Sequence, residues 1–308
     1  MLRTHFHKNI IWYDFIQLNE ESNDKNFQNL VKEKNIHPYI VKKFLTKTNR
    51  DKALLLNDNL YLSLHFPDLK HDDYVSQEIK FIIGRNYIIT NQEIENEGLA
   101  KFKTIFESNA SFEKDDEKDS CVVYVFLHMI EKIYENMIFE LGNLGKRIEK
   151  IEENIFKDKE KYMVKKISET NRDLLDFKRN IRSHEETWKV FLDLSKKYFR
   201  KETSHTALES ILISYKKTET QAQDLSELIH DLRDTNNSLL SAKQGDMSKT
   251  FTLITFLTMP ATLFYTIISL PAAQTFFGEH VKDFWEIMYI SFGLFFIMLL
   301  YTIYKKWW

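Results

Sequence analysis

The sequence has few of the residues and motifs on which common enzyme and metal sites are built. Its single cysteine, Cys121, excludes an intrachain disulfide and any metal site made of several cysteines. It contains no G-x-x-x-x-G-K-S/T loop, no G-x-S-x-G and no H-E-x-x-H. No basic cluster with interleaved aromatic residues indicates a nucleic-acid surface. We therefore expect no enzyme, no covalent cofactor and no direct binding of nucleic acid.

Glycine and proline are scarce, with 7 and 4 in 308 residues, and residues 146–244 contain neither. Such a stretch favours long helices. Charged residues make up 29% of the chain, yet the runs Thr250–Gly278 and Ile287–Tyr304 contain none. Because about 20 apolar residues cross a bilayer as a helix, the sequence predicts two transmembrane helices, at about 250–271 and 284–304. The alternative is two helices buried in a protein core.

Lysines flank the outer ends of both apolar runs. They are Lys243, Lys249, Lys305 and Lys306, whereas the segment between the runs has only Lys282. By the positive-inside rule both termini are cytoplasmic and the connecting loop is outside. The N-terminus has no long apolar segment, so we expect no signal peptide. The predicted location is the inner (plasma) membrane, with a multi-pass topology.

The first part of the chain, residues 1–120, has the pattern of a cytoplasmic α/β domain. Three segments rich in β-branched and aromatic residues predict strands: Ile10–Leu18, Ala53–Asp68 and Glu78–Thr90. Turn residues at 57–59 and 84–86 interrupt two of them, as hairpins require. Between the strands, residues 20–45 are typical of helix up to a break before Pro38. The charged stretch 112–120 is expected to be a solvated linker.

Residues 121–249 predict a helical region that ends in a stalk helix. Apolar residues alternate by three and four positions along two seams. The first seam is Tyr134, Met137, Leu141, Leu144, Ile148, Ile151 and Ile155. The second is Leu208, Ile211, Tyr215, Thr218, Ala222, Leu225, Ile229, Leu232, Asn236 and Leu239. The second seam runs on toward the first apolar run, which favours a stalk packed against its own copies around an axis. The alternative is a helical bundle within one chain.

Residues 250–308 form the predicted membrane domain, and its first helix carries a stripe of small polar residues on one side. The stripe is Thr252, Thr255, Met259, Thr262, Thr266 and Ser269. In a ring of identical helices such a stripe could line a water-filled channel. Hydroxyls of this kind also bond back to the helix carbonyls or serve as small packing residues. The pattern alone leaves both interpretations open. Pro260 is expected to bend this helix, and Pro271 to end it.

In the order and spacing of its segments, the chain resembles the CorA family of pentameric divalent-cation channels. The segments are "WYDF" at Trp12, "NIHPYIVKKFL" (35–45), "LYLSLHFPD" (60–68), "EIKFIIGRNYIIT" (78–90), "MP" at Met259-Pro260 and "YKKWW" at the C-terminus. The resemblance implies a homopentameric funnel of α/β domains, stalk helices and two transmembrane helices. It also implies that Met259 and Thr262 face the pore and that Asp234 lies near its cytoplasmic entrance.

One departure from the family concerns the ion filter. Where the family has Gly-Met-Asn, this chain has Ser269, Leu270 and Pro271. In the family the asparagine amide oxygens hold a hydrated cation at the outer mouth. Proline has no side-chain oxygen, and a serine hydroxyl is a weaker ligand. The resemblance therefore supports the architecture better than it supports selectivity for Mg²⁺.

The loop between the two apolar runs is acidic. Glu279 and Asp283 in five copies would make an outer collar that concentrates cations. Ordinary solvated loop charge explains these residues equally well.

Two functions follow from the resemblance. The first is passive transport of a divalent cation, Mg²⁺ or another, which serves as the transported or regulatory ion. The second is an effector of a type III CRISPR system, in which a nucleotide second messenger opens the pore. The sequence leaves the ion and the gating ligand open.

Overall fold

The computed structural model describes residues 2–7, 9–20, 24–68, 75–108, 118–157, 159–199, 202–269 and 281–304. The chain divides into two compact units, Met1–Arg233 and Asp234–Trp308, here called unit 1 and unit 2. The three-part division predicted from the sequence, with boundaries at 120 and 249, stays a prediction.

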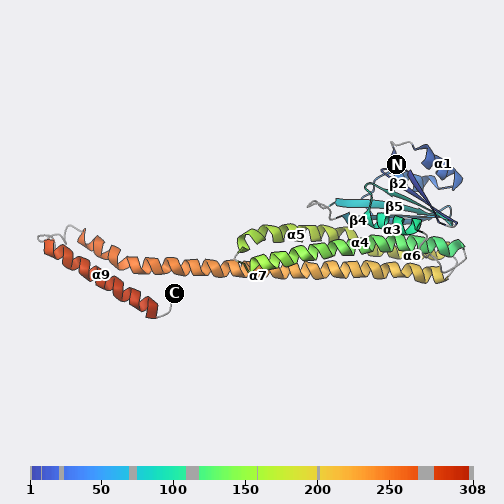
Figure 1. Ribbon diagram of the computed structural model, residues 1–308. Coiled ribbons are helices and arrows are strands. Elements are labelled where there is room, and N and C mark those ends of the chain that lie inside the picture. The colour runs from blue at the N-terminus through green and yellow to red at the C-terminus, as the bar shows by residue number, and fades with distance from the viewer. Residues whose placement is uncertain are drawn as a thin grey trace. The chain divides into compact units, whose positions relative to one another are not determined.

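Unit 1 contains a mixed sheet of six strands (Figure 1). They are β1 (Leu2–His7), β2 (Ile10–Ile16), β3 (Lys52–Leu56), β4 (Asn59–Asp68), β5 (Val75–Ile83) and β6 (Tyr87–Gln92). Their spatial order is β1-β2-β6-β5-β4-β3, and β2 and β6 are the one parallel pair. The predicted strands are confirmed. The sequence prediction missed β1, which pairs with β2 along its whole length at the edge of the sheet.

Both predicted hairpins are present, and each turn has a physical reason. Asn57 and Asp58 join β3 to β4 with φ of 49° and 53°. Positive φ at both central residues is the signature of the type I′ turn, whose twist matches that of the flanking strands. The turn between β5 and β6 needs Gly84 for a different reason. A Cβ at that position would lie 2.2 Å from the ring of Tyr87.

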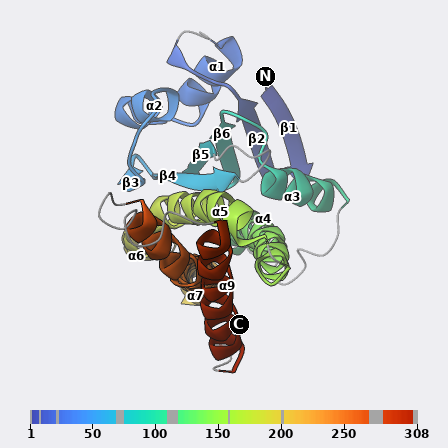
Figure 2. The ribbon, with the colours of Figure 1, turned by 90° about the vertical axis from the view of Figure 1, so that its left-hand side faces the viewer.

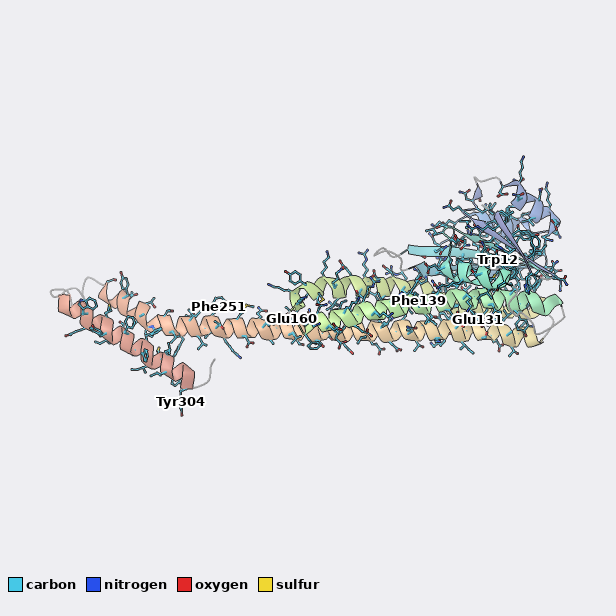
Figure 3. The ribbon with its side chains drawn as sticks, viewed as in Figure 1. Trp12, Glu131, Phe139, Glu160, Phe251 and Tyr304 are labelled. Atoms are coloured by element: carbon cyan, nitrogen blue, oxygen red, sulfur yellow. The ribbon has the colours of Figure 1, made fainter. Side chains whose placement is uncertain are left out.

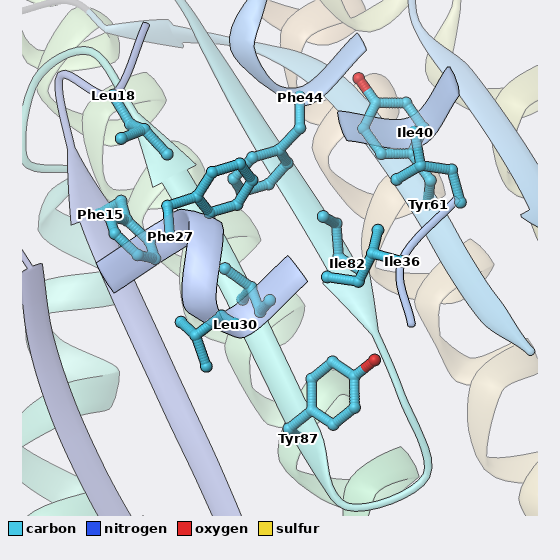
Figure 4. Close-up of a cluster of buried hydrophobic side chains, with 11 residues drawn as sticks. Phe15, Leu18, Phe27, Leu30, Ile36, Ile40, Phe44, Tyr61, Ile82 and Tyr87 are labelled. Carbon is cyan, nitrogen blue, oxygen red and sulfur yellow. The ribbon is translucent and has the colours of Figure 1, made fainter. Parts of the chain in front are cut away.

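Helices α1 (Lys25–Glu33) and α2 (Pro38–Leu45) cover one face of the sheet (Figure 2). The Asp24 side chain caps α1 by accepting from the N–H groups of Asn26 and Phe27. Pro38 is the first residue of α2, where its missing N–H costs nothing. The apolar sides of both helices and of the strands form one core cluster, shown in Figure 4.

The other face of the sheet is covered by α3 (Glu97–Glu107), α4 (Lys118–Ile155), α5 (Glu160–Ile181) and α6 (His184–Tyr198). Trp12 of β2 packs edge-on against Phe102 and Phe106 of α3. Helices α3 and α4 approach so closely that a Cβ on Gly98 would lie 2.6 Å from the Cα of Ile133. Because both faces are covered, every residue of β6 is buried.

Alongside the sheet, α4, α5 (Glu160–Ile181), α6 and the first part of α7 (Glu202–Ile268) lie side by side as a bundle (Figure 1). All residues of the first predicted seam are buried in α4. Its Tyr134 meets Tyr215 of the second seam, with ring centroids 6.5 Å apart. Leu208, Thr218 and Leu232 of the second seam are also buried within a single chain.

This burial changes the interpretation of the second seam. Its periodicity favoured a surface that packs against copies of the chain and left a bundle within one chain as the alternative. In unit 1 the seam is instead used within one chain, because α4 and α6 supply apolar side chains of their own. The intrachain bundle is therefore the correct reading for this part of α7, and the seam no longer argues for an oligomer.

Unit 2 contains the end of α7 and α9 (Val281–Tyr304). Helix α7 continues through Pro260 and ends at Ile268, before the predicted stop at Pro271, which lies outside the described residues. In the part of the chain that the structure describes, no helix meets the length and apolarity needed to cross a membrane. The two membrane-spanning helices predicted at 250–271 and 284–304 are thus not found here.

Candidate functional site

The stripe of small polar residues lies on one exposed side of α7. Thr252, Thr255, Met259, Thr262, Thr266 and Ser269 are all exposed to solvent, and the Met259 side chain is 60% accessible. Leu253 is buried, and Phe256 and Leu257 are half-buried. At about 100° per residue Leu253 and Leu257 point away from the stripe, and Phe256 lies at its flank. The hydroxyls are therefore on an open side of the helix, which also exposes Phe251.

Every hydroxyl of the stripe donates to a backbone carbonyl one turn earlier. The bonds run from Thr252 to Ser248, Thr255 to Phe251, Thr262 to Thr258, Thr266 to Thr262 and Ser269 to Tyr265, at 2.7–3.1 Å. This is the back-bonding that the sequence left as one interpretation. A hydroxyl has one proton and two lone pairs. With the proton donated to the helix, the oxygen can still accept from a molecule on the open side.

Asp234, proposed from the family resemblance as a carboxylate near a pore entrance, lies on α7 within unit 2 and is exposed. It precedes Thr252 by five full turns of about 3.6 residues. Asp234 and the stripe thus share one side of the helix. The other predicted positions cannot be placed in the same way. Leu270, Pro271 and Glu279 lie outside the described residues. Asp283 is in the first turn of α9, and its side chain is not described.

A buried polar network in unit 1 was not foreseen from the sequence. It centres on Asp51, whose side chain is 1% exposed. One carboxylate oxygen accepts from Nδ1 of His65 at 2.8 Å, and the other accepts from the Ser183 hydroxyl. Nε2 of His65 faces the Thr48 carbonyl at 2.8 Å. Both ring nitrogens of His65 therefore face acceptors, the arrangement that suits a protonated imidazole.

The network continues through His184, which is completely buried. Its Nε2 donates to the His65 carbonyl at 2.9 Å, and its Nδ1 accepts from the Tyr134 hydroxyl at 2.8 Å. The indole N–H of Trp188 donates to the same hydroxyl at 2.8 Å. His184 is therefore neutral, with its proton on Nε2. The chain of bonds ties α6 to α4 and to β4.

The protonation of these groups follows from their surroundings. Burial lowers the pKa of His184, and the nearby Asp51 carboxylate offsets only part of that shift. Burial also acts on His65, but the hydrogen bond and charge of Asp51 outweigh it and raise the pKa of His65. Burial acts to raise the pKa of Asp51, but His65, His184 and Ser183 together lower it below its ordinary value.

This network has the residue types of a nucleophilic triad but not their order. Catalysis by a serine requires the histidine between the serine and the carboxylate, so that it can take the hydroxyl proton. Here Asp51 lies between His65 and Ser183. The arrangement stabilises the fold and does not activate Ser183. Asp51 and Ser183 are 132 positions apart in the chain, so no local motif could have revealed the network.

The segment "WYDF", which begins at Trp12, also has a structural role. Trp12 donates to the Thr90 hydroxyl at 2.9 Å, and Thr90 donates to the buried Asp14 at 2.6 Å. The Gln92 amide donates to the same carboxylate. Burial raises the pKa of Asp14, while these bonds oppose that shift. All of these side chains link β2 to β6 under α3.

Two histidines lie close together near the N-terminus. His5 and His7 are both buried in β1. Nδ1 of His5 is 2.9 Å from a carboxylate oxygen of Glu107, and its ring packs against Trp12. Among the described residues no group of three or more metal-ligating side chains is found.

The comparison with protein families decides what these features belong to. The family model described as "CorA-like Mg2+ transporter protein" matches residues 7–308. The chain belongs to this family. The predicted resemblance is thereby confirmed over nearly the whole sequence, including the helices of unit 2. None of the curated proteins matches the chain.

Solved structures show the same fold at low sequence identity. The complete CorA magnesium transporter of Methanocaldococcus jannaschii is 16% identical and has a TM-score of 0.77, covering 98% of this chain and 93% of its own. The full-length CmaX protein is 10% identical with a TM-score of 0.67, covering 94% and 88%. The ZntB cytoplasmic domain of Vibrio parahaemolyticus is 13% identical with a TM-score of 0.51, covering 76% and 90%. At these identities the likeness concerns the fold.

Proposed function

We propose that the chain is a channel that passes a divalent cation, Mg²⁺ or a similar ion, across the inner membrane. In this proposal it works as a homopentamer, with the open side of α7 toward a central pore. The observation that carries the proposal is the exposed stripe from Thr252 to Ser269, opposite the covered apolar side of the same helix. Membership of a transporter family supports it. We propose no enzymatic activity.

The chemistry of the stripe suits a hydrated cation. Because each hydroxyl donates its proton to the helix, only oxygen lone pairs remain on the open side. The water molecules around a cation point their protons outward and need acceptors. Rings of such oxygens, repeated around an axis, would hold the hydrated ion without stripping its water. Asp234 adds a carboxylate to the same side.

The membrane location rests on the sequence. The runs Thr250–Gly278 and Ile287–Tyr304 have no charge, and lysines flank their outer ends. In this arrangement both termini are cytoplasmic. The side chains of Phe251 and Tyr304, labelled in Figure 3, are 70% and 87% exposed in the single chain. Large exposed apolar side chains of this kind suit contact with lipid or with other subunits.

Selectivity in this proposal comes from two places. Met259 is the one apolar member of the stripe, so a ring of Met259 side chains would form a constriction whose wetting controls conduction. The filter position, with Ser269, Leu270 and Pro271, offers a hydroxyl in place of an amide. An outer collar of Glu279 and Asp283 would concentrate cations before they enter.

The test is ion flux into liposomes for Mg²⁺, Co²⁺, Zn²⁺ and K⁺. Met259→Ala should raise flux, because it widens the constriction. Ser269→Ala should change the preference among ions more than the total flux. Placing Gly, Met and Asn at 269, 270 and 271 should increase the preference for Mg²⁺. The matched control is Leu257→Ala, which removes a similar volume from the covered side of the helix.

Two outcomes would remove the pore assignment. One is Met259→Ala conducting like the parent for all four ions. The other is Leu257→Ala raising flux as much as Met259→Ala does. In either case the hydroxyl stripe would be a packing surface.

Assembly and topology have separate tests. Native mass spectrometry in mild detergent should show five subunits, and a stable monomer or dimer would contradict the pentamer. A reporter that is active only outside the cytoplasm, fused after Trp308, should be silent. Strong reporter activity would reverse the proposed topology.

The alternative, a pore opened by a nucleotide second messenger, predicts a different result in the same liposome assay. A pore opened by a nucleotide second messenger should conduct only when the nucleotide is present on the side of unit 1. A transporter should conduct without it. Type III CRISPR genes beside the gene for this chain would favour the effector.

A further inference from the structure

A cavity of about 850 Å³ opens in unit 1 where the junction of α5 and α6 meets β3 and the residues that precede it. Its basic lining residues are Lys47, Arg50, Lys52 and Arg179. Asn49, Ser76, Asn180, Ser183 and Thr187 add polar groups. The volume is in the range of sites for small molecules, about 300–1,000 Å³. The cavity belongs to one chain and is independent of unit 2.

The four cations come from two segments that are far apart in the sequence, and their charge is only partly used. Lys47 pairs with Glu93 at 2.8 Å and Arg179 with Asp176 at 3.2 Å, in pairs that are largely exposed. Such pairs contribute little and exchange readily. Within the described residues, the Arg50 side chain forms no ion pair. The Lys52 ammonium faces Tyr39 of α2, donating to its hydroxyl at 3.4 Å and lying over its ring. A ligand with several negative oxygens could therefore engage Lys47, Arg50 and Arg179.

The carboxylates of the cavity do not cancel this charge. Asp51 is the buried one, and it is neutralised by His65 and bonded by Ser183. Glu186 is the other lining carboxylate. The floor of the cavity is thus an internally satisfied ion pair. Glu186 is the one lining carboxylate that this pair does not neutralise, and it stands against the cations of Lys47, Arg50 and Arg179.

Two further features point donors into the cavity. Asn180 accepts from the Ser76 hydroxyl at 3.1 Å through its Oδ1, which leaves its amide N–H groups as donors. Ser183 precedes α6, whose first turn contributes Glu186 and Thr187 to the lining, and its side chain makes no cap to the helix. The N-terminus of a helix carries a partial positive charge and free N–H groups.

We propose that this cavity binds a small molecule that carries two or more phosphate groups. A single carboxylate would occupy one arginine, whereas linked phosphates present oxygens in several directions to cations and amide donors placed around them. Because Arg179 and Asn180 belong to the end of α5 and Lys47 to Lys52 precede or begin β3, the ligand would hold the α5–α6 junction to the sheet. The proposal does not depend on ion conduction by unit 2.

The test is isothermal titration calorimetry of the full chain in detergent, without added divalent cations, using inorganic pyrophosphate as the probe. Citrate is the second titrant, because it has similar charge without phosphate. We expect saturable binding of pyrophosphate that weakens as salt is raised from about 0.1 to 0.5 M, since salt screens the cations. Citrate should bind at least about tenfold more weakly.

The variant Arg50→Gln/Arg179→Gln should weaken pyrophosphate binding at least about tenfold, because both guanidinium groups are lost. Both side chains are exposed, so the fold should be retained, and an unchanged melting temperature would verify this. The matched control is Lys157→Gln/Lys165→Gln, which removes two exposed cations from unit 1 outside the cavity. Absence of saturable pyrophosphate binding, equal binding of citrate, or equal loss in both double variants would overturn the proposal.

Discussion

Unit 1 and unit 2 differ in which side chains they bury and which they expose. Unit 1 buries polar groups such as Asp51, His184 and Thr90 and gives each a hydrogen-bond partner. Unit 2 exposes large apolar side chains, among them Phe251 and Met259, and turns its hydroxyls back onto its own helix. Unit 1 also exposes some large side chains, such as Phe139 and Tyr162, so the two units differ in degree. In the proposed function, the exposed apolar side chains of unit 2 would contact lipid or further subunits.

The difference between the units predicts that a large apolar side chain contributes much more to the free energy of unfolding in unit 1 than in unit 2. Trp188 of unit 1 is fully buried against Phe126 and Phe191, whereas Phe251 of unit 2 is 70% exposed. Trp188→Ala should lower the free energy of unfolding by about 3–5 kcal/mol, because it leaves a cavity and removes the hydrogen bond that the indole N–H donates to the Tyr134 hydroxyl. Phe251→Ala should change it by less than about 0.5 kcal/mol. Denaturant unfolding in detergent, followed by near-ultraviolet circular dichroism, measures both.

A second test uses two glycines of unit 1 that differ only in what surrounds them. Gly98→Ala should destabilise by about 1–3 kcal/mol, because its Cβ would meet the backbone of α4. Gly142 in α4 has no neighbour within 4 Å of the same position, so Gly142→Ala should stabilise by up to about 1 kcal/mol. Melting temperatures of the two variants should move in opposite directions. A fall for both would mean that Gly142 also faces a contact in the assembled protein.

The pH dependence of stability is expected to come from unit 1. His184 has a folded-state pKa below its ordinary value of 6.5, so the unfolded chain binds the proton more readily. Its contribution is complete above about pH 6.5 and is lost as the pH falls toward the lowered pKa. His65 has a raised pKa, so its contribution to stability has the opposite pH dependence and is lost as the pH rises through that raised pKa.

His184→Gln removes one side of this balance. The melting temperature of the parent should fall between pH 7 and pH 5 more steeply than that of the variant. His230→Gln, an exposed position on α7, is the control and should keep the slope of the parent. Parallel slopes for the parent and His184→Gln would show that His184 is not the group that titrates.

A smaller effect is expected at the hairpin turn of unit 1. Asp58 has a φ of 53°, which glycine adopts without strain. Asp58→Gly should stabilise the fold by about 0.5–1 kcal/mol, and Asp58→Val should destabilise it by about 1–2 kcal/mol. Chemical denaturation of both variants measures the difference. A destabilised Asp58→Gly would indicate that the aspartate side chain itself is needed in the turn.

The smallest expected change in stability comes from replacing one threonine of α7 in each unit. Thr218 is buried in unit 1 and Thr262 is exposed in unit 2, and each donates to the carbonyl four residues earlier. Thr→Val at either position should change the free energy of unfolding by less than about 0.5 kcal/mol, because the carbonyl keeps its helix bond. Only Thr262→Val should alter ion flux in liposomes. Altered flux for Thr218→Val would remove the functional distinction between them.

Local patterns predicted the elements of this chain well. The hairpin at Asn57-Asp58, the helix break before Pro38 and the buried seam from Tyr134 to Ile155 were all expected from residue types and spacing. Backbone preferences and hydrophobic periodicity depend on residues close together in the chain, so they can be predicted from the sequence. The family resemblance could be detected for the same reason, because it rests on the order of such segments along the chain.

Tertiary structure decided the rest, because it depends on what lies opposite each side chain. The second seam has the same periodicity whether its partner is another subunit or another helix, and only packing showed that α4 and α6 of the same chain cover it. Strand β1 is short and histidine-rich, and it is held by pairing with β2. The Asp51–His65–His184 network unites residues from three segments, so it exists only after the sheet and the bundle have come together.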